Sequence, residues 1–530
     1  MGSPFVSEQA LAETYDLDTG WETVTQYREA IRLRRENPGM ARAEIARRVG
    51  RSASAVRGWL AEGKTPRVVS GLKTANERGW IDIDAESEQF RALNQLVAWL
   101  FSGGGLRMDA YVPLFSVDNS LMLAILSQLL RWARIDYRCR EPDEPDGHLE
   151  VVPTEGGAVL GRVLSVLGAP QGVKADIDDL TLPAYLSTVG CDYRRDFARI
   201  YLLNRSHDFE TANTDGTVMC PTPSEPYCRE VCDLFDTVTS GTATLGSQHR
   251  VWVSAAAVRD LAGETPLRSA LATAALHGSL TPPTERAIGS TFRRSETPGG
   301  YRYHQLYRTI REREDSRATL AAETGLPEST IQSWRRGAKP YVTNALTQAT
   351  ERGWLTPPAD SETATALIGL LTWLLAAGSL RETYLPVFGA PLPAQQKRFE
   401  SIATTLELDY NTVQSGDPNR PTEIRPAEDG TLLGRVLYTL GAPRQTEPQT
   451  TALLPPVVYH YRRYARQVAE IWCLHHASET DRGLTIAVPP RVSDRFPDAL
   501  ATLFSERLAW TVEQYDRELL VTDRSNDPVV

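Results

Sequence analysis

The sequence predicts an α+β chain, a mixed α/β protein in which two tandem modules each join a helical unit to a core of helices and antiparallel strands. The first observation is a repeat: QLVAWLFSGGGLRMDAYVPLF (95–115) returns as GLLTWLLAAGSLRETYLPVF (369–388). The second is that apolar residues recur at helical spacing in some segments and alternate with polar residues in others. We therefore expect one module that is used twice.

Composition places the chain among soluble globular proteins. It has 530 residues, of which 41% are hydrophobic and 23% are charged, and this length predicts several domains. No apolar run is long enough to span a membrane, and residues 1–22 have none of the features of a signal peptide. Six cysteines give no disulfide framework. We expect a cytoplasmic protein without a membrane partner.

Arginine carries nearly all of the positive charge. The net charge is -10, and only five of the 57 basic residues are lysine. This pattern is typical of proteins from a salt-rich cytoplasm or a GC-rich genome, as in archaeal halophiles. An acidic chain can still bind nucleic acid if its basic residues are clustered on one part of its surface.

The repeat and the turn signals divide the chain into expected segments. Residues 265–300 are expected to contain a short apolar helix, Leu267 to Leu280, before a stretch rich in Pro, Gly, Ser and Thr. The expected segments are a disordered acidic tail at 1–23, a helix-turn-helix unit at 24–85, a core at 86–264, a linker at 265–300, a second helix-turn-helix unit at 301–360, a second core at 361–522, and a tail at 523–530.

Two stretches have the spacing of a helix-turn-helix. Ala46, Gly50 and Val56 supply the small residue, the turn glycine and the apolar residue that the motif requires. Ser52 is a natural N-cap for the second helix. The second copy repeats the three marker positions at a shift of 275, as Ala321, Gly325 and Ile331. Both units also close on an identical ERGW, at 77–80 and 351–354.

A helix-turn-helix places the N-terminal half of its second helix in a DNA major groove. The expected contacts of that helix with bases or phosphates are Arg51, Ser54, Arg57, Ser329, Gln332 and Ser333. The expected phosphate contacts are Lys64, Arg67, Arg335, Arg336 and Lys339. The alternative is that these residues form the solvated face of an ordinary helical bundle. Trp59 and Trp334 fall three residues after the apolar marker and are expected in the core.

The core of the first module predicts the order helix, strand, helix, strand, strand, helix. The expected elements are a helix over 90–101 that ends at the triple glycine 103–105, a strand over 111–117, a helix over 121–132, strands at 134–140 and 148–152, and a helix over 158–167. Alternation in RIDYRCR puts Arg138 and Arg140 on its polar face, and we include both among the expected DNA contacts. GTLLGRVLYTLGAP (430–443) echoes GAVLGRVLSVLGAP at a shift of 273.

LVAWLFSGGGL and LLTWLLAAGSL resemble the helix and turn of LAGLIDADG homing endonucleases. Two fainter stretches fit the same family, DFARIYLLNRS (196–206) and QVAEIWCLHHA (467–477). The resemblance implies αββαββα cores, in which two halves surround a pseudo-twofold axis and antiparallel sheets lie in the DNA major groove. It also implies that an acid at the turn binds a catalytic metal.

The chain departs from the family at that acid. Carried over residue by residue, the acid falls on Gly103, Ala377, Arg205 and His476, none of which is a carboxylate. Phosphodiester cleavage with two metals needs hard oxygen ligands. The resemblance therefore implies DNA binding without cleavage, with no metal or other cofactor. Ile200 and Ile471 are bulky where the family packs small residues.

Two further clusters have structural explanations. Cys220, Cys228 and Cys232 suggest zinc, but the last two lie four apart on an expected helix and the second module has no counterpart. We expect them to be structural, and we expect the doublet at 475–476 to lie at the surface or to cap a helix.

We therefore expect a sequence-specific regulator that binds double-stranded DNA, is associated with the nucleoid and has no small-molecule substrate. Helix-turn-helix units joined to a LAGLIDADG-like core also resemble WhiA-like bacterial regulators, although the order of parts differs. One alternative is a working endonuclease whose acids lie elsewhere, for example Asp109 or Asp118. The other is an RNA-binding, maturase-like protein.

Overall fold

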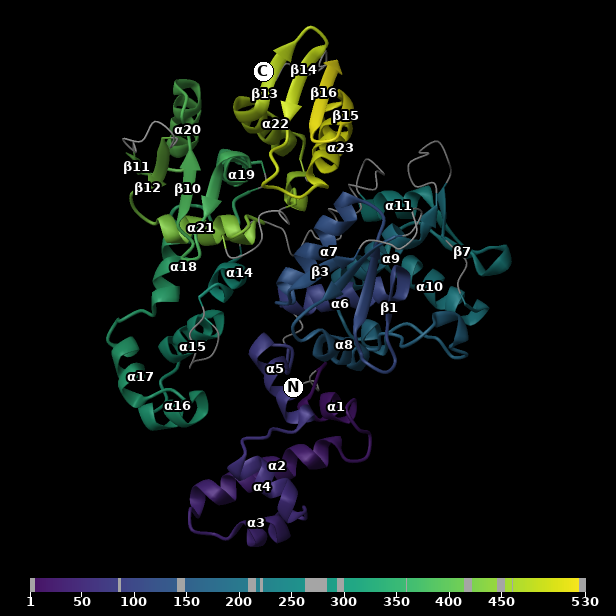
Figure 1. Cartoon of the computed structure of the whole chain (residues 1–530), viewed down its shortest axis with the longest axis vertical. Coiled ribbons are helices and arrows are strands. Elements are labelled where there is room, and N and C mark those ends of the chain that lie inside the picture. The colour runs from purple at the N-terminus through teal and green to yellow at the C-terminus, as the bar shows by residue number, and fades with distance from the viewer. Residues whose placement is uncertain are drawn as a thin grey trace. The chain divides into compact units, whose positions relative to one another are not determined.

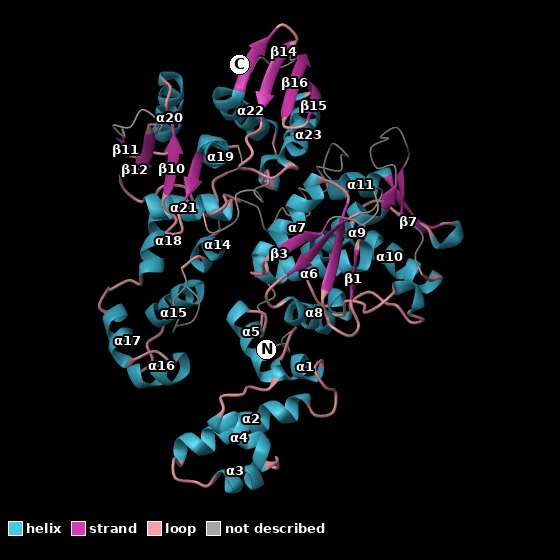
Figure 2. Cartoon of the chain, viewed as in Figure 1, coloured by secondary structure: helices cyan, strands magenta, loops and turns pink. Residues whose placement is uncertain are grey.

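The chain forms two compact units, Met1–Ala275 and Leu276–Val530. The computed structural model describes residues 5–83, 87–140, 148–207, 216–219, 223–262, 284–292, 300–358, 360–413, 422–445, 453–459 and 461–523. Helices and four small antiparallel sheets make up the described part (Figure 2), which confirms the expected α+β class. Cys220 and the expected helix 267–280 lie outside the described residues.

Unit 1 begins with five helices and continues with two sheets and the helices that cover them (Figure 1). The helices are α1 (Glu8–Glu13), α2 (Gly20–Glu36), α3 (Arg42–Val49), α4 (Ala53–Ala61), α5 (Arg67–Arg78), α6 (Glu88–Ser102), α7 (Ser120–Trp132), α8 (Gly157–Val166), α9 (Cys191–Arg205), α10 (Glu225–Val238) and α11 (Ala255–Ala262). The strands are β1 (Gly104–Leu106), β2 (Pro113–Val117), β3 (Tyr137–Arg140), β4 (Leu149–Pro153), β5 (Ser206–His207), β6 (Gly216–Met219), β7 (Ala243–Leu245) and β8 (Val251–Ser254).

Unit 2 repeats this order. Its helices are α14 (Glu285–Ser290), α15 (Gly300–Glu312), α16 (Arg317–Thr324), α17 (Glu328–Arg335), α18 (Tyr341–Glu351), α19 (Glu362–Ala377), α20 (Pro393–Thr405), α21 (Gly430–Thr439), α22 (Arg462–His476) and α23 (Phe496–Leu508). Its strands are β9 (Gly378–Leu380), β10 (Pro386–Gly389), β11 (Tyr410–Val413), β12 (Glu423–Pro426), β13 (Ala477–Thr480), β14 (Gly483–Ala487), β15 (Thr511–Tyr515) and β16 (Glu518–Asp523).

Each unit contains two half-cores with the order helix, strand, strand, helix, strand, strand. In all four sheets the strands lie in the spatial order first, second, fourth, third, and every pair is antiparallel. The residue-based expectation missed the first strand, because it took the triple glycine only as the end of a helix. Gly104 instead enters β1, where a Cβ would lie 2.6 Å from the Leu114 carbonyl oxygen on β2. Glycine permits this close approach of two strands.

A pair of long helices forms the centre of each unit, α6 with α9 and α19 with α22. Ala98 of α6 and Ala198 of α9 are fully buried, and so are the bulky Ile200 and Ile471. Asp196 of α9 is also fully buried and forms ion pairs with Arg91 of α6 and Arg199. Two cations on one buried carboxylate supply the pairing that a buried charge requires.

The helix-turn-helix units are three-helix bundles with their own apolar cores. In unit 1 this core contains Ala30 and Leu33 of α2, Ile45, Ala46 and Val49 of α3, and Val56 of α4. The corresponding core in unit 2 includes Ile331. Trp334 is buried against Tyr303 and Tyr307, while Trp59 is partly buried against the first core and Tyr27. The expectation that both tryptophans belong to the core is confirmed.

The expected disordered tail at 1–23 was wrong in part, because it contains α1. In the expected linker at 265–300, α14 forms in the stretch rich in Pro, Gly, Ser and Thr, where no helix was expected. Ser7 caps α1 by accepting a hydrogen bond from the Ala10 amide, and Thr284 caps α14 in the same way through Ala287. The two helices bury Leu11 and Ile288 respectively, so their apolar faces bind them to the fold. No described helix combines the length and the apolar run that a bilayer crossing requires.

Candidate nucleic-acid interface

The turn between α3 and α4 has the conformation that its sequence predicts. Gly50 ends α3 with a φ of 69°, a left-handed conformation that favours glycine, and Ser52 caps α4 by accepting from the Ala55 amide at 3.2 Å. In unit 2, Gly325 ends α16 with a φ of 71° and Pro327 precedes α17. Both second helices therefore start at a fixed position after a tight turn.

Most of the expected DNA contacts are available to a partner. The exposed ones are Ser54, Arg57, Lys64, Arg67, Arg138, Arg140, Ser329, Ser333, Arg336 and Lys339, and Gln332 is half-exposed. In both units the exposed positions lie on the second helix or in the loop after it, except for Arg67, which begins α5, and the two arginines of β3. The geometry is that of an accessible polar helix face.

Arg51 and Arg335 differ from the expectation, because both are bound inside the helical bundle. Arg51 donates to the Thr23 hydroxyl of α2 at 2.6 Å and also to Gln26. Arg335 donates to the carbonyl oxygens of Arg313 and Asp315, at 2.9 and 2.6 Å. Arg51 precedes the N-cap of the second helix and reaches back to the preceding one, so it braces the turn rather than extending into solvent.

In unit 1 two of the exposed basic side chains, Arg57 and Lys64, form ion pairs with Glu62. Glu62 lies 2.9 Å from Arg57 Nε and 2.8 Å from Lys64 Nζ. Hydrogen bonds from Lys64 and Arg57 lower the pKa of the Glu62 carboxyl. At the shift of 275 the position of Glu62 is Gly337 in unit 2, and Lys339 forms no ion pair within the described residues. The two units thus carry different charge on the same surface.

Positive charge is concentrated in the helical units. Residues 20–80 contain 13 basic and six acidic side chains, and residues 300–354 contain nine and six, in a chain whose net charge is -10. Arg42 and Arg317 were missed among the candidate contacts, although they match at the shift of 275. Each is exposed at the first position of the helix before the turn. Backbone N–H groups at such a helix end also attract phosphate.

The sheet surface of unit 1 is less uniform. Arg138 and Arg140 lie on β3, an edge strand, and Arg140 is opposite Glu150 of β4 with 3.8 Å between their charged groups. The corresponding residues of β11 in unit 2 are Asn411 and Val413. The pair of arginines is therefore a feature of one module, whereas the helix-turn-helix occurs in both.

The four positions where the resemblance would place acids lie at the ends of the paired helices. Gly103 and Arg205 end α6 and α9, while Ala377 and His476 end α19 and α22. Asn204 fills the space at Gly103: a Cβ there would lie 3.0 Å from its Cγ, and its amide donates to Ser102 Oγ at 2.9 Å.

In both pairs a basic side chain donates hydrogen bonds to the carbonyl oxygens at the C-terminal end of the first helix. Lys174 Nζ donates to the carbonyl oxygens of Leu100 and Gly104, at 2.8 and 2.7 Å. Arg491 donates to the carbonyl oxygens of Leu375 and Gly378, at 2.7 and 3.3 Å. Burial lowers the pKa of Lys174 to about 8, and the charge of Arg205 acts in the same direction. These cations complement the negative end of the helix dipole.

The histidine doublet lies inside the second helix pair, so the expected surface position was wrong. His475 is partly buried, and its ring packs edge-on against Trp373 with 4.8 Å between ring centres. Burial lowers the pKa of His475 to about 4, helped by His476 and Arg491. His476 donates to the Ala376 carbonyl oxygen at 2.9 Å, and this bond is of the expected capping kind.

The described cysteines of the zinc hypothesis lie on the buried face of α10. Cys228 donates to the His249 carbonyl oxygen at 2.9 Å, and burial raises the pKa of the Cys232 thiol to about 11. Within the described ranges, no three His, Cys, Asp or Glu side chains are grouped closely enough to hold a metal ion.

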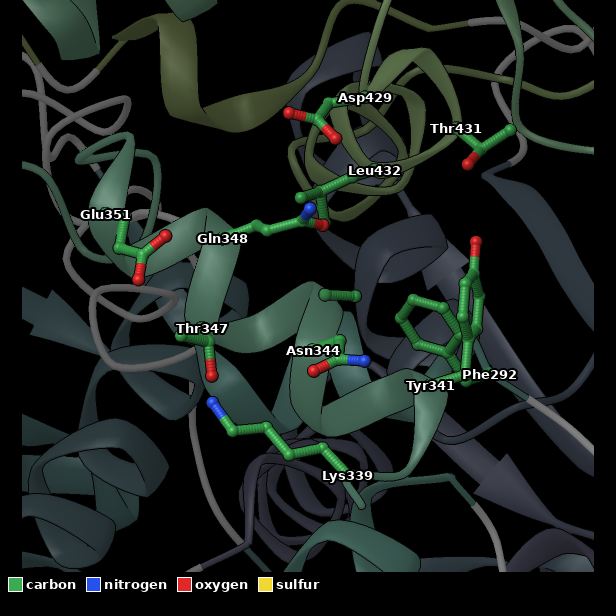
Figure 3. A pocket seen from close by; sticks show the side chains of 11 residues that line it. Phe292, Lys339, Tyr341, Asn344, Thr347, Gln348, Glu351, Asp429, Thr431 and Leu432 are labelled. Atoms are coloured by element: carbon green, nitrogen blue, oxygen red, sulfur yellow. The ribbon is translucent and has the colours of Figure 1, made fainter. Parts of the chain in front are cut away.

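Unit 2 also contains a polar cavity of about 400 Å³ between α18 and α21 (Figure 3). Phe292 and Tyr341 form one wall with their rings 5.5 Å apart, and Asn344 and Gln348 project from α18. Asp429 lies at the start of α21 and accepts two hydrogen bonds from Arg352. The cavity therefore adjoins the junction between the helix-turn-helix unit and the core.

No model of a known protein family matches the sequence, and no curated protein is significantly similar to it.

Proposed function

We propose that the protein binds double-stranded DNA at specific sequences, as a transcriptional regulator that does not cut its target. The observation that carries this proposal is the duplicated helix-turn-helix, in which an exposed polar second helix lies within a locally basic segment of an acidic chain. An acidic remainder opposes nonspecific adhesion to nucleic acid, so the basic helical units would bear most of the phosphate contact.

The arrangement of the cores supports a LAGLIDADG-like origin for the scaffold. Four half-cores share one order of elements and one order of strands, and a helix pair lies at the centre of each unit. This is the arrangement that the sequence resemblance implies. In the proposal, each module would read DNA with its helix-turn-helix and with the outer surface of its sheets.

The ends of the helix pairs support binding without cleavage. Hydrolysis assisted by two metals requires carboxylate oxygen at the metal. None of the four residues at these helix ends is a carboxylate: they are Gly103 and Arg205 in one pair, and Ala377 and His476 in the other. In addition, positive charge lies at the same ends, on Lys174 and Arg491. Positive charge disfavours a second cation at that place.

The test compares nucleic acids and checks for cleavage. Duplexes enriched from a random library are expected to bind more tightly than structured RNA at the same salt concentration. Added Mg²⁺ or Mn²⁺ is expected to leave the bound duplex intact. Tighter binding to RNA would favour the maturase-like alternative. Plasmid nicking that Asp109→Ala abolishes would favour a working endonuclease, although Asp109 lies in the loop at the opposite end of the β1–β2 hairpin from Gly103.

A further inference from the structure

The same arginine occurs in both copies of the repeated GRVL, and it is stacked between two aromatic rings. The guanidinium carbon of Arg162 on α8 lies 3.9 Å from the ring centre of Tyr15 and 4.0 Å from that of Tyr111. The guanidinium carbon of Arg435 on α21 lies 3.9 Å from the ring centre of Phe292 and 4.2 Å from that of Tyr384. A planar guanidinium stacks on both faces, whereas a lysine ammonium does not.

Hydrogen bonds complete each stack. Arg435 donates to the carbonyl oxygen and the hydroxyl of Thr291, at 2.7 and 2.8 Å. Arg162 donates to the same two groups of Thr14. The threonine and the first ring follow α1 or α14, the helix that leads into each helix-turn-helix unit. The arginine belongs to the core, so each stack joins the two parts of a module.

The glycine before each arginine brings the second ring into place. A Cβ on Gly161 would lie 1.7 Å from the Tyr111 carbonyl oxygen, and one on Gly434 would lie 1.8 Å from that of Tyr384. The helix therefore passes directly against the loop between the first two strands of the sheet. This explains why the GR pair recurs in both modules.

A second attachment lies at the other end of the helical unit, in the identical ERGW. Arg78 donates to the Arg134 carbonyl oxygen, and Arg352 donates to the Glu407 carbonyl oxygen at 2.6 Å. These acceptors correspond at a shift of 273, and each follows the second helix of its half-core. Trp80 and Trp354 are fully buried beside them. One attachment would leave a pivot, but two separated attachments oppose rotation.

We infer that Arg162 and Arg435 are positioning residues that hold each helix-turn-helix at a fixed orientation on its core. The functional consequence rests on the proposed DNA binding: within one module, the helix-turn-helix and the sheet surface of the core would contact DNA at a fixed spacing. The linker between modules would then be the place where spacing varies.

The orientation can be measured in the full chain without DNA. Spin labels at Ala322→Cys on α16 and Thr405→Cys on α20 report the distance between the helical unit and the core, after Cys139, Cys191 and Cys220 are replaced by Ser. We expect a single narrow distance distribution. Arg435→Leu should raise the undocked population roughly tenfold, which corresponds to about 1.4 kcal/mol. Arg302→Leu, an exposed arginine on α15, is the matched control and should change nothing.

Phe292→Ala is the second variant, because it removes one ring and leaves Arg435 in place. Circular dichroism of each variant checks folding. Unchanged distance distributions in both Arg435→Leu and Phe292→Ala would overturn the inference, whether or not the protein binds DNA.

The affinity for DNA sites of altered spacing distinguishes a positioning role of Arg435 from a general contribution to the stability of the fold. One or two base pairs are inserted within a selected site, between the part protected by the helix-turn-helix of unit 2 and the part protected by the core of unit 2. The wild type should lose binding by at least about tenfold, and Arg435→Leu should lose less, because the released helical unit can follow the shifted half-site. Equal losses in the two proteins would refute the positioning role. A failure to select any duplex would count against the proposed function and leave the distance measurement valid.

Discussion

Replacing Glu62 with Gln tests whether the exposed cations after α4 contact DNA phosphate. The Glu62 carboxylate lies 2.9 Å from Arg57 Nε and 2.8 Å from Lys64 Nζ, so one acid occupies two of the expected contacts. In Glu62→Gln both cations are free to bind phosphate and to release counterions. Each phosphate contact steepens the plot of log affinity against log salt by about 0.9.

Two contacts would therefore steepen this slope by up to about 1.8, so that affinity would fall about 12-fold further between 50 and 200 mM salt than in the wild type. Fluorescence anisotropy with one labelled duplex over that range measures the slope. Glu36→Gln is the matched control, since it removes one acid of the same helical unit that pairs with Arg32 on α2. If Glu62→Gln and Glu36→Gln have the same slope, Arg57 and Lys64 are not phosphate contacts.

Three further predictions concern the reading helices and the helix pairs. Arg57→Ala and Gln332→Ala should each weaken specific binding by about 1–3 kcal/mol without changing the unfolding midpoint, and unchanged footprints in both would exclude the helix-turn-helix contacts. His475 binds its proton less readily in the folded protein, with a pKa of about 4 against an ordinary value near 6.5. Stability should therefore fall as pH decreases from 6.5 to 4, by of the order of 1 kcal/mol per pH unit, and urea unfolding of His475→Gln should lack that loss. Lys174 has a pKa of about 8 against about 10.5 when unfolded, so stability should rise between pH 8 and 10 relative to Lys174→Met. Parallel pH profiles of the two proteins would refute this assignment.

Turn chemistry and duplication made the helix-turn-helix units predictable. The turn after the first helix has a left-handed backbone conformation, which glycine adopts readily, at Gly50 and Gly325. The apolar residue at the expected spacing after each glycine, Val56 or Ile331, is buried. A match in one copy supports the other, because the same buried pattern is required twice. The alternation in RIDYRCR predicted a half-buried antiparallel strand, and β3 does pair antiparallel with β4, but Cys139 on the expected buried face is exposed.

Other features depend on tertiary contacts that no local pattern reveals. The helices α1 and α14 have only six residues each, too few for a clear helical period. Their signal was a second repeat, SEQALAETY against TERAIGSTF, at a shift of 277 rather than 274 or 275. The direction of Arg51 back to α2 and the close approach of Gly161 to Tyr111 both depend on the packed fold. The arginine stacks are likewise visible only in three dimensions.

The proposed function depends most on whether the two helix-turn-helix units read a DNA sequence. The most direct measurement is the affinity of the full chain for a duplex selected from a random library, compared with a scrambled duplex of the same composition at one fixed salt concentration. We expect the selected duplex to bind at least about 1,000-fold more tightly than the scrambled one, and a protein that carries both Arg57→Ala and Gln332→Ala to lose most of that preference. Equal affinity for the two duplexes, or a preference that survives both substitutions, would contradict the proposed function.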